Sequence, residues 1–97
     1  MTRTEHLLVI LSEECAEVAK EVSKALRFGL DDAEPGKPET NREKIASEFN
    51  DLFAVMLMLK EEGIFEDKQL LTLEAIKKKK ARVERYLLYS QEVGRLD

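Results

Sequence analysis

Three carboxylates lie close together near the start of the chain, at Glu13, Glu14 and Glu17. On a helix, Glu14 and Glu17 share one face and Glu13 is the i+4 neighbour of Glu17, so the three negative charges crowd one another. Two carboxylates about 4 Å apart repel by roughly 4 kcal/mol at an effective dielectric constant near 20, and a cation bound between them reverses the sign of the interaction. The spacing therefore predicts a binding site for a divalent metal ion.

A second acidic pair, Glu48 and Asp51, repeats the i, i+3 spacing of Glu14 and Glu17. Each pair comes one residue before two positions of the apolar row expected in its own helix, so the two offsets are identical. If the two helices form an antiparallel hairpin, equal offsets place both pairs on the same side of it. The pairs also lie at similar heights, roughly 10 to 16 Å from the connecting loop at 1.5 Å per residue. We therefore expect the four side chains to converge.

The expected site offers carboxylate oxygens and has no histidine or thiolate ligand. Hard oxygen ligands suit Mg²⁺, with Mn²⁺ as a substitute, far better than zinc or copper. A ferritin-like di-iron site would need a Glu-x-x-His pair, which the chain lacks. The four predicted metal ligands are Glu14, Glu17, Glu48 and Asp51.

Capping signals divide the chain into three long helices. Thr2 and Thr40 each have a glutamate three residues later, which is the spacing of a capping box. Gly29 and Gly63 stand where a helix favours a left-handed residue at its C-terminal end. We expect helices over about 5–28, 41–62 and from 66 or 67 to about 90, with a glycine- and proline-containing loop after the first.

The apolar rows of these helices predict an all-α antiparallel bundle of three long helices, with room for one short additional helix. The rows have the spacing of bundle helices and contain Leu8, Leu11, Cys15, Val18, Val22 and Ala25 on the first helix, and Ile45, Phe49, Leu52, Met56 and Leu59 on the second. Cys15 is expected to be a small buried hydrophobic residue. The second helix is apolar on all sides between Leu52 and Leu59, which a few helices of one chain cannot easily surround. We therefore predict one domain over residues 1–97, completed by assembly as a homodimer or homotetramer.

Composition excludes several classes of protein. The net charge of -4 argues against binding to a nucleic-acid polymer, and 43% hydrophobic with 37% charged residues favours a folded helical chain over a disordered one. The longest apolar run, over residues 52–59, is far shorter than the roughly 20 residues that span a membrane. One cysteine permits no internal disulfide, and no signal peptide precedes the first charged residues. We expect a cytoplasmic protein with no membrane partner.

The pattern Glu13-Glu14-x-x-Glu17 followed by Glu48-x-x-Asp51 resembles the signature of the MazG-like all-α nucleoside triphosphate pyrophosphohydrolases. These are relatives of the dimeric dUTPases and of phosphoribosyl-ATP pyrophosphatase. The resemblance implies Mg²⁺-dependent cleavage of a nucleoside triphosphate, expected to be a deoxyribonucleotide, into a monophosphate and pyrophosphate, as house-cleaning of the nucleotide pool. It also implies that the four carboxylates above are the metal ligands. Glu13 would orient a ligand or accept a proton from the attacking water.

Triphosphate chemistry suits these residues independently of the resemblance. A triphosphate cannot approach an acidic cluster unless metal ions bridge carboxylate and phosphate. The chain has no Walker-type glycine loop, so side chains must contact the phosphates. The candidates on the third helix are Lys79, Lys80, Arg82 and Tyr86.

The nucleobase is expected one to two turns before the acidic pair on the first helix. Leu7 and Ile10 lie there, on the same stripe as Glu14 and Glu17, and offer an apolar wall. Because the chain has no tryptophan, an aromatic stacking partner must come from Phe28, Phe49, Phe53, Phe65, Tyr86 or Tyr89.

Three alternatives stay open. One is a phosphoribosyl-ATP pyrophosphatase-like enzyme, which shares the reaction type. Another is a non-enzymatic helical interaction module, for which Mg²⁺ would neither stabilise the fold nor enable turnover. The third is a small RNA-binding protein built around the basic run Lys77 to Lys80, which the net negative charge makes the weakest.

Overall fold

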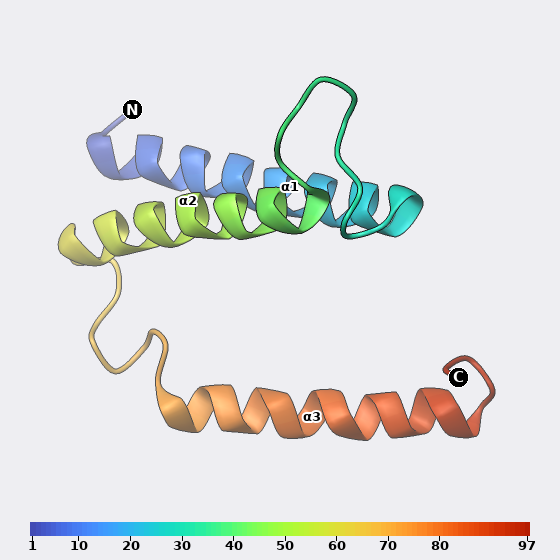
Figure 1. The fold of residues 1–97 in the computed structure, drawn as a ribbon. Helices are drawn as coiled ribbons and strands as arrows, with labels where there is room; N and C mark the ends of the chain where they lie inside the picture. Colours follow the sequence, from blue (N-terminus) through green and yellow to red (C-terminus); the bar gives the residue numbers. More distant parts are fainter. The chain divides into compact units, whose positions relative to one another are not determined.

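The computed structural model describes residues 1–97 and confirms the all-α prediction (Figure 1). Its three helices are α1 (Arg3–Phe28), α2 (Asn41–Glu61) and α3 (Leu73–Glu92). The chain divides into two compact units, Met1–Phe65 and Glu66–Asp97. The first unit is an antiparallel hairpin of α1 and α2, joined by the loop over residues 29–40, and the second contains α3. None of the three helices combines the length and the apolar character that a membrane crossing requires.

The predicted capping residues set the ends of the hairpin helices. Thr40 and Glu43 form a reciprocal capping box, in which each side chain accepts a hydrogen bond from the other residue's backbone N–H at 3.2 Å. Thr2 caps α1 by accepting a hydrogen bond from the Glu5 N–H at 3.1 Å. Gly29 follows α1 with a φ of 100°, a backbone angle that favours glycine. The ends of α1 and α2 therefore follow from local hydrogen bonding.

The predicted start of the third helix near residue 66 is wrong, because α3 begins at Leu73. The preceding segment forms turns, in which the Glu66 N–H donates to the side chain of Gln69 at 2.8 Å. Leu71 then adopts a φ of 54°, which a continuous right-handed helix does not allow. Thr72 caps the new helix by accepting a hydrogen bond from the Ala75 N–H. The helix begins where this cap forms, after the interruption at Leu71.

The hairpin has a small apolar core near the open ends of its helices. Leu7 of α1 is buried against Val55 and Leu59 of α2, and half-buried side chains from both helices and the following segment pack around them. Leu59 has no exposed surface at all. This core fixes which face of α1 meets α2.

The apolar row predicted for α1 is partly wrong. The buried and half-buried residues form a row that we call the α1 interface row: Leu7, Leu11, Glu14, Val18, Glu21 and Ala25. Leu11, Val18 and Ala25 belong to both this row and the predicted row. At the other three positions the interface row contains the residue that directly precedes the predicted one. Cys15 is consequently exposed rather than buried, and Val22 is 39% exposed. Apolar periodicity marks the widest apolar face of α1, whereas α2 packs to one side of that face.

The corresponding row on α2 is also rotated from the prediction. The α2 interface row contains Asn41, Ile45, Glu48, Leu52, Val55 and Leu59. Phe49, predicted to lie in the row, is exposed and stacks on Phe53, with ring centroids 6.3 Å apart. Each interface row therefore contains a glutamate near its middle, Glu14 on α1 and Glu48 on α2.

Candidate metal centre

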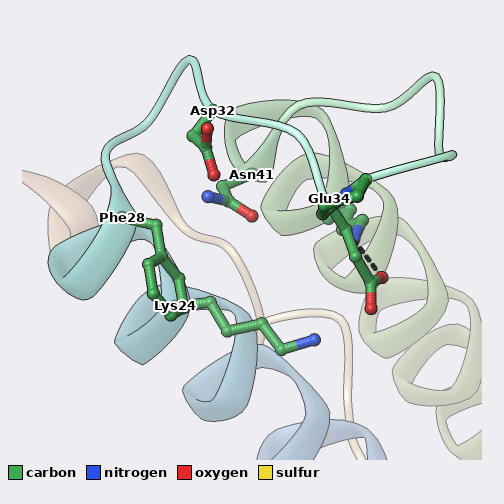
Figure 2. Close-up of a pocket in the computed structure, with 7 residues that line it drawn as sticks. Lys24, Phe28, Asp32, Glu34 and Asn41 are labelled. Carbon is green, nitrogen blue, oxygen red and sulfur yellow. Dashed lines mark ion pairs between the residues drawn. The ribbon is translucent and has the colours of Figure 1, made fainter.

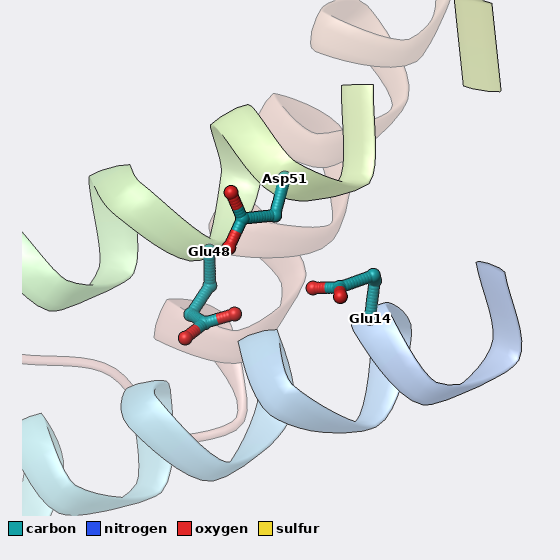
Figure 3. Close-up of side chains that lie close together, drawn as sticks. All are labelled: Glu14, Glu48 and Asp51. Atoms are coloured by element: carbon teal, nitrogen blue, oxygen red, sulfur yellow. The ribbon is translucent and has the colours of Figure 1, made fainter. Parts of the chain in front are cut away.

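The hairpin brings three of the four predicted metal ligands together. Glu14 from α1 and Glu48 and Asp51 from α2 each offer a carboxylate oxygen, and these atoms all lie within 4.8 Å of one another. Figure 3 shows the Glu14 side chain reaching from its helix toward the two carboxylates of α2. We call this group the carboxylate cluster. Glu14 and Glu48 are half-buried, whereas Asp51 is exposed.

The interface rows explain why these side chains meet. Glu14 follows Leu11 by one turn in the α1 interface row, and Glu48 precedes Leu52 by one turn in the α2 interface row. The acidic pairs were predicted one residue outside the apolar rows. Instead, one member of each pair lies in the interface itself, so the packing of the hairpin determines how close the carboxylates are.

The cluster is electrostatically unfavourable without a bound cation. Partial burial raises the pKa of Glu48 above its ordinary value of 4.5, and the negative charges of Asp51, Glu14 and Glu17 raise it further. A hydrogen bond with the Glu14 side chain acts in the same direction. The residues therefore favour a proton or another positive charge at this position.

One carboxylate oxygen of the cluster accepts no hydrogen bond. Glu14 Oε2 is buried and has no hydrogen-bond partner. An unpartnered buried oxygen is costly, and a cation in contact with it would remove that cost. The donor set is made of carboxylate oxygens, which suit Mg²⁺ or Mn²⁺ and do not suit a soft metal. The residues present therefore fit a hard divalent cation.

The other acidic residues of the predicted site lie at its margin. Glu17 is exposed and is not one of the three grouped carboxylates, although its charge contributes to the raised pKa of Glu48. Glu13 is also exposed on α1. Neither side chain is held by packing, so both have rotamer freedom to turn toward a ligand.

The predicted phosphate-binding residues belong to the second unit. Lys79, Lys80, Arg82 and Tyr86 are all exposed on α3. Exposed cationic side chains are available to bind phosphate groups. Their participation in the site stays a prediction.

The two residues predicted to contact a nucleobase differ in their surroundings. Leu7 is buried in the core against Val55 and Leu59, where its side chain stabilises the hairpin. Ile10 is exposed on α1. Only Ile10 therefore presents its side chain to a ligand.

Sequence reasoning missed two charged residues of the hairpin interface. The Glu21 side chain is only 9% exposed, its Oε2 atom is buried without a partner, and its other carboxylate oxygen lies 3.8 Å from Lys24 Nζ. The Lys44 side chain is 15% exposed and pairs with Glu34 at 3.5 Å. Their spacing could have placed them on the same helix faces as the metal ligands, because Glu21 lies two turns after Glu14 and Lys44 lies one turn before Glu48.

Comparison with known proteins gave no family model, no curated protein and no solved structure that matches this chain.

Proposed function

We propose that the protein is a Mg²⁺-dependent nucleoside triphosphate pyrophosphohydrolase that cleaves between the α and β phosphates. The proposal rests chiefly on the carboxylate cluster, in which two helices contribute three oxygens within 4.8 Å of one another. The buried, unpartnered Oε2 atom of Glu14 supports it, as does the resemblance of the acidic pattern to MazG-like enzymes. The biological role proposed is the removal of non-canonical or surplus nucleotides.

The acidic residues take different roles in this proposal. Glu14, Glu48 and Asp51 hold the metal, with Glu17 as the fourth ligand. A bound Mg²⁺ would offset phosphate charge and make a bound water more acidic. Glu13 orients a ligand or accepts a proton from the attacking water. The carboxylates of the cluster repel a triphosphate when no cation is bound, so activity depends strictly on the metal.

Basic residues of α3 supply the remaining phosphate contacts in this proposal. Lys79, Lys80 and Arg82 are cationic and exposed, and Tyr86 offers a hydroxyl group. An arginine guanidinium binds phosphate oxygens in pairs, and lysine ammonium groups act as point charges. These residues bind the substrate and orient it, and they carry no covalent step.

Product analysis tests the reaction. We expect the full-length protein to convert a ribo- or deoxyribonucleoside triphosphate to monophosphate and pyrophosphate in the presence of Mg²⁺, and to release nothing with a chelator. The panel should include phosphoribosyl-ATP, whose preferred cleavage would instead support the related pyrophosphatase. Chromatography separates the products. Diphosphate with inorganic phosphate would contradict cleavage between the α and β phosphates, and no turnover would favour the interaction module.

The proposal includes assembly as a homodimer or homotetramer. Phe49 and Phe53 form a stacked aromatic pair on α2 and are 41% and 39% exposed. Val22 and Leu26 of α1 are exposed as well, and α3 buries none of its residues. Large exposed apolar side chains, such as the stacked pair on α2, are typical of an interface with another chain. A second copy of α2 would cover the aromatic pair.

Light scattering coupled to size-exclusion chromatography tests the assembly. We expect the mass of the wild-type protein to be that of a dimer or tetramer, and Phe53→Glu to shift it toward the monomer, because a buried unpaired carboxylate is costly. Gln91→Glu, which adds the same charge at an exposed polar position of α3, should leave the mass unchanged. A monomeric wild-type protein would contradict the proposed assembly.

A further inference from the structure

A pocket of about 260 Å³ lies at the closed end of the hairpin, beneath the 29–40 loop. Figure 2 shows Phe28 and Lys24 entering it from α1, Asp32 and Glu34 from the loop, and Asn41 from α2. Pro35 and Lys44 complete the lining. Drug-sized ligands occupy pockets of about 300 to 1,000 Å³, so this one suits a single ring system rather than a whole nucleotide.

Several hydrogen bonds hold the loop in the shape that forms the pocket. The Asn41 side chain donates to the carbonyl of Gly29 at 2.9 Å, and the Asn41 backbone N–H donates to the carbonyl of Asp32 at 2.9 Å. Arg42 adds a backbone hydrogen bond to Leu30, and the Lys44–Glu34 ion pair joins α2 to the loop. These contacts tie the first half of the loop, residues 29–34, to the start of α2, so the pocket is formed before a ligand binds.

The chemistry of the lining favours a neutral ring over an anion. Phe28 and Pro35 provide apolar ring surfaces, and the Phe28 residue is 60% exposed. The charged lining residues are two acids, Asp32 and Glu34, and two lysines, so their formal charge sums to zero. A phosphate tail would gain no net attraction here. A flat heterocycle with hydrogen-bond donors and acceptors on its edge could stack on the aromatic ring and use both signs of charge.

A second hollow lies beside this pocket and extends to Glu48 of the carboxylate cluster. It has a volume of about 310 Å³, shares Lys24, Glu34 and Lys44 with the pocket, and is also lined by Glu48 and Glu21. Asn41 at the pocket and Glu48 at the cluster are seven positions apart on α2, or roughly 10 Å along the helix axis. That separation suits a nucleotide with its base at one end and its phosphates at the other.

Glu21 supplies an acceptor between the two ends. Its side chain is nine-tenths buried, and Oε2 has no hydrogen-bond partner. A hydroxyl group of a sugar is a suitable donor to such an oxygen. The pocket, the hollow and the cluster together therefore offer a contact for each part of a nucleotide, in the order base, sugar and metal-bound phosphate.

We propose that the pocket beneath the 29–40 loop binds the nucleobase of the substrate, stacked on Phe28, while the phosphates reach the carboxylate cluster. This inference rests on the proposed function and names the base-recognition site of the same enzyme. It places the base on the opposite side of the cluster from Leu7 and Ile10. Phe28 is thereby selected from the six aromatic residues that the sequence offered.

The test compares substrates with and without a base. We expect Phe28→Leu to lower kcat/KM for the preferred nucleoside triphosphate by about 5- to 100-fold, mainly through KM, because the variant removes base–aromatic stacking. Its kcat/KM for methyl triphosphate, which has no base, should be unchanged. Val9→Ala is the matched control, because Val9 is an exposed apolar residue of α1 outside the pocket. Ile10→Ala tests the rival position for the base.

The outcomes separate this inference from the proposed function. If wild-type protein cleaves triphosphates but Phe28→Leu affects both substrates equally, or neither, the pocket assignment is overturned and the activity stands. The assignment would also be overturned if Ile10→Ala, and not Phe28→Leu, lowered kcat/KM for the nucleoside triphosphate while leaving that for methyl triphosphate unchanged. If no triphosphate is cleaved, the function fails, and nucleosides without phosphate are titrated into the isotopically labelled full chain. Backbone amide NMR shifts confined to the pocket residues would support base binding there, and their absence would overturn it.

Discussion

Glu48→Gln should reduce Mg²⁺-dependent triphosphate cleavage at least about a hundredfold, since losing even an outer-shell partner of a metal ligand typically costs 10- to 100-fold. Glu48 belongs to the carboxylate cluster and lies in the interface row of α2, so its carboxylate is held toward Glu14. Glutamine keeps the size of the side chain but removes the negative charge that a divalent cation requires. The measurement is kcat from pyrophosphate release at saturating Mg²⁺.

Two further measurements distinguish the loss of a metal ligand from a general effect of removing an acidic side chain or of unfolding. Glu61→Gln is the matched control, because Glu61 is an exposed acidic residue of the same helix that lies outside the cluster. It should retain full activity. The melting temperature of metal-free Glu48→Gln should equal or exceed that of the wild type at neutral pH, since the variant removes a repelling charge. An active Glu48→Gln protein would contradict the assigned metal site, whereas an unfolded one would contradict the charge argument.

Mg²⁺ should also stabilise the folded protein strongly. An ion present at about 100 times its dissociation constant stabilises the folded state by about 2.7 kcal/mol, which raises the melting temperature of a domain of this size by roughly 11 to 22 °C. The gain arises because the cation offsets repulsion among carboxylates that folding has brought within 4.8 Å of one another. Thermal unfolding followed by circular dichroism measures the shift. Sodium chloride at the same ionic strength is the control and should give a much smaller effect.

The dependence of stability on pH should change sign when the metal is added. Without metal, the folded-state pKa of Glu48 is raised, so its stabilising contribution is fully present below pH 4.5 and is lost as the pH rises through the folded-state pKa. With Mg²⁺, binding requires the ionised carboxylate, so the stabilisation by metal grows over the same rise in pH. Glu48→Gln should reduce both effects. Parallel curves of melting temperature against pH, with and without Mg²⁺, would count against the proposed site.

Local signals predicted much of the first unit. The side chains of Thr2 and Thr40 and the glycine at position 29 set helix ends by hydrogen bonds within a few residues, and these can be read without knowing the fold. The start of α3 could not be read in the same way. The left-handed backbone of Leu71 has no signature in its residue type, because leucine rarely adopts a φ of 54°.

Side-chain packing accounts for the other errors. Cys15 and Phe49 fit the apolar spacing of a buried row, yet both are exposed, because the hairpin helices meet along rows rotated toward Glu14 and Glu48. Periodicity identifies a wide apolar face, but a neighbouring helix covers only part of it. The partner helix determines which part.

The sequence by itself determined that the chain is helical, where the hairpin helices end, and that two acidic pairs stand at equal spacing on them. Those properties depend on residues within one or two turns of each other. Only the tertiary structure decided that Glu14, Glu48 and Asp51 meet, that Glu21 is buried, and that a pocket forms beneath the loop at Phe28. These depend on the rotation of α1 against α2 and on hydrogen bonds from Asn41 to the loop, which involve residues distant in the chain.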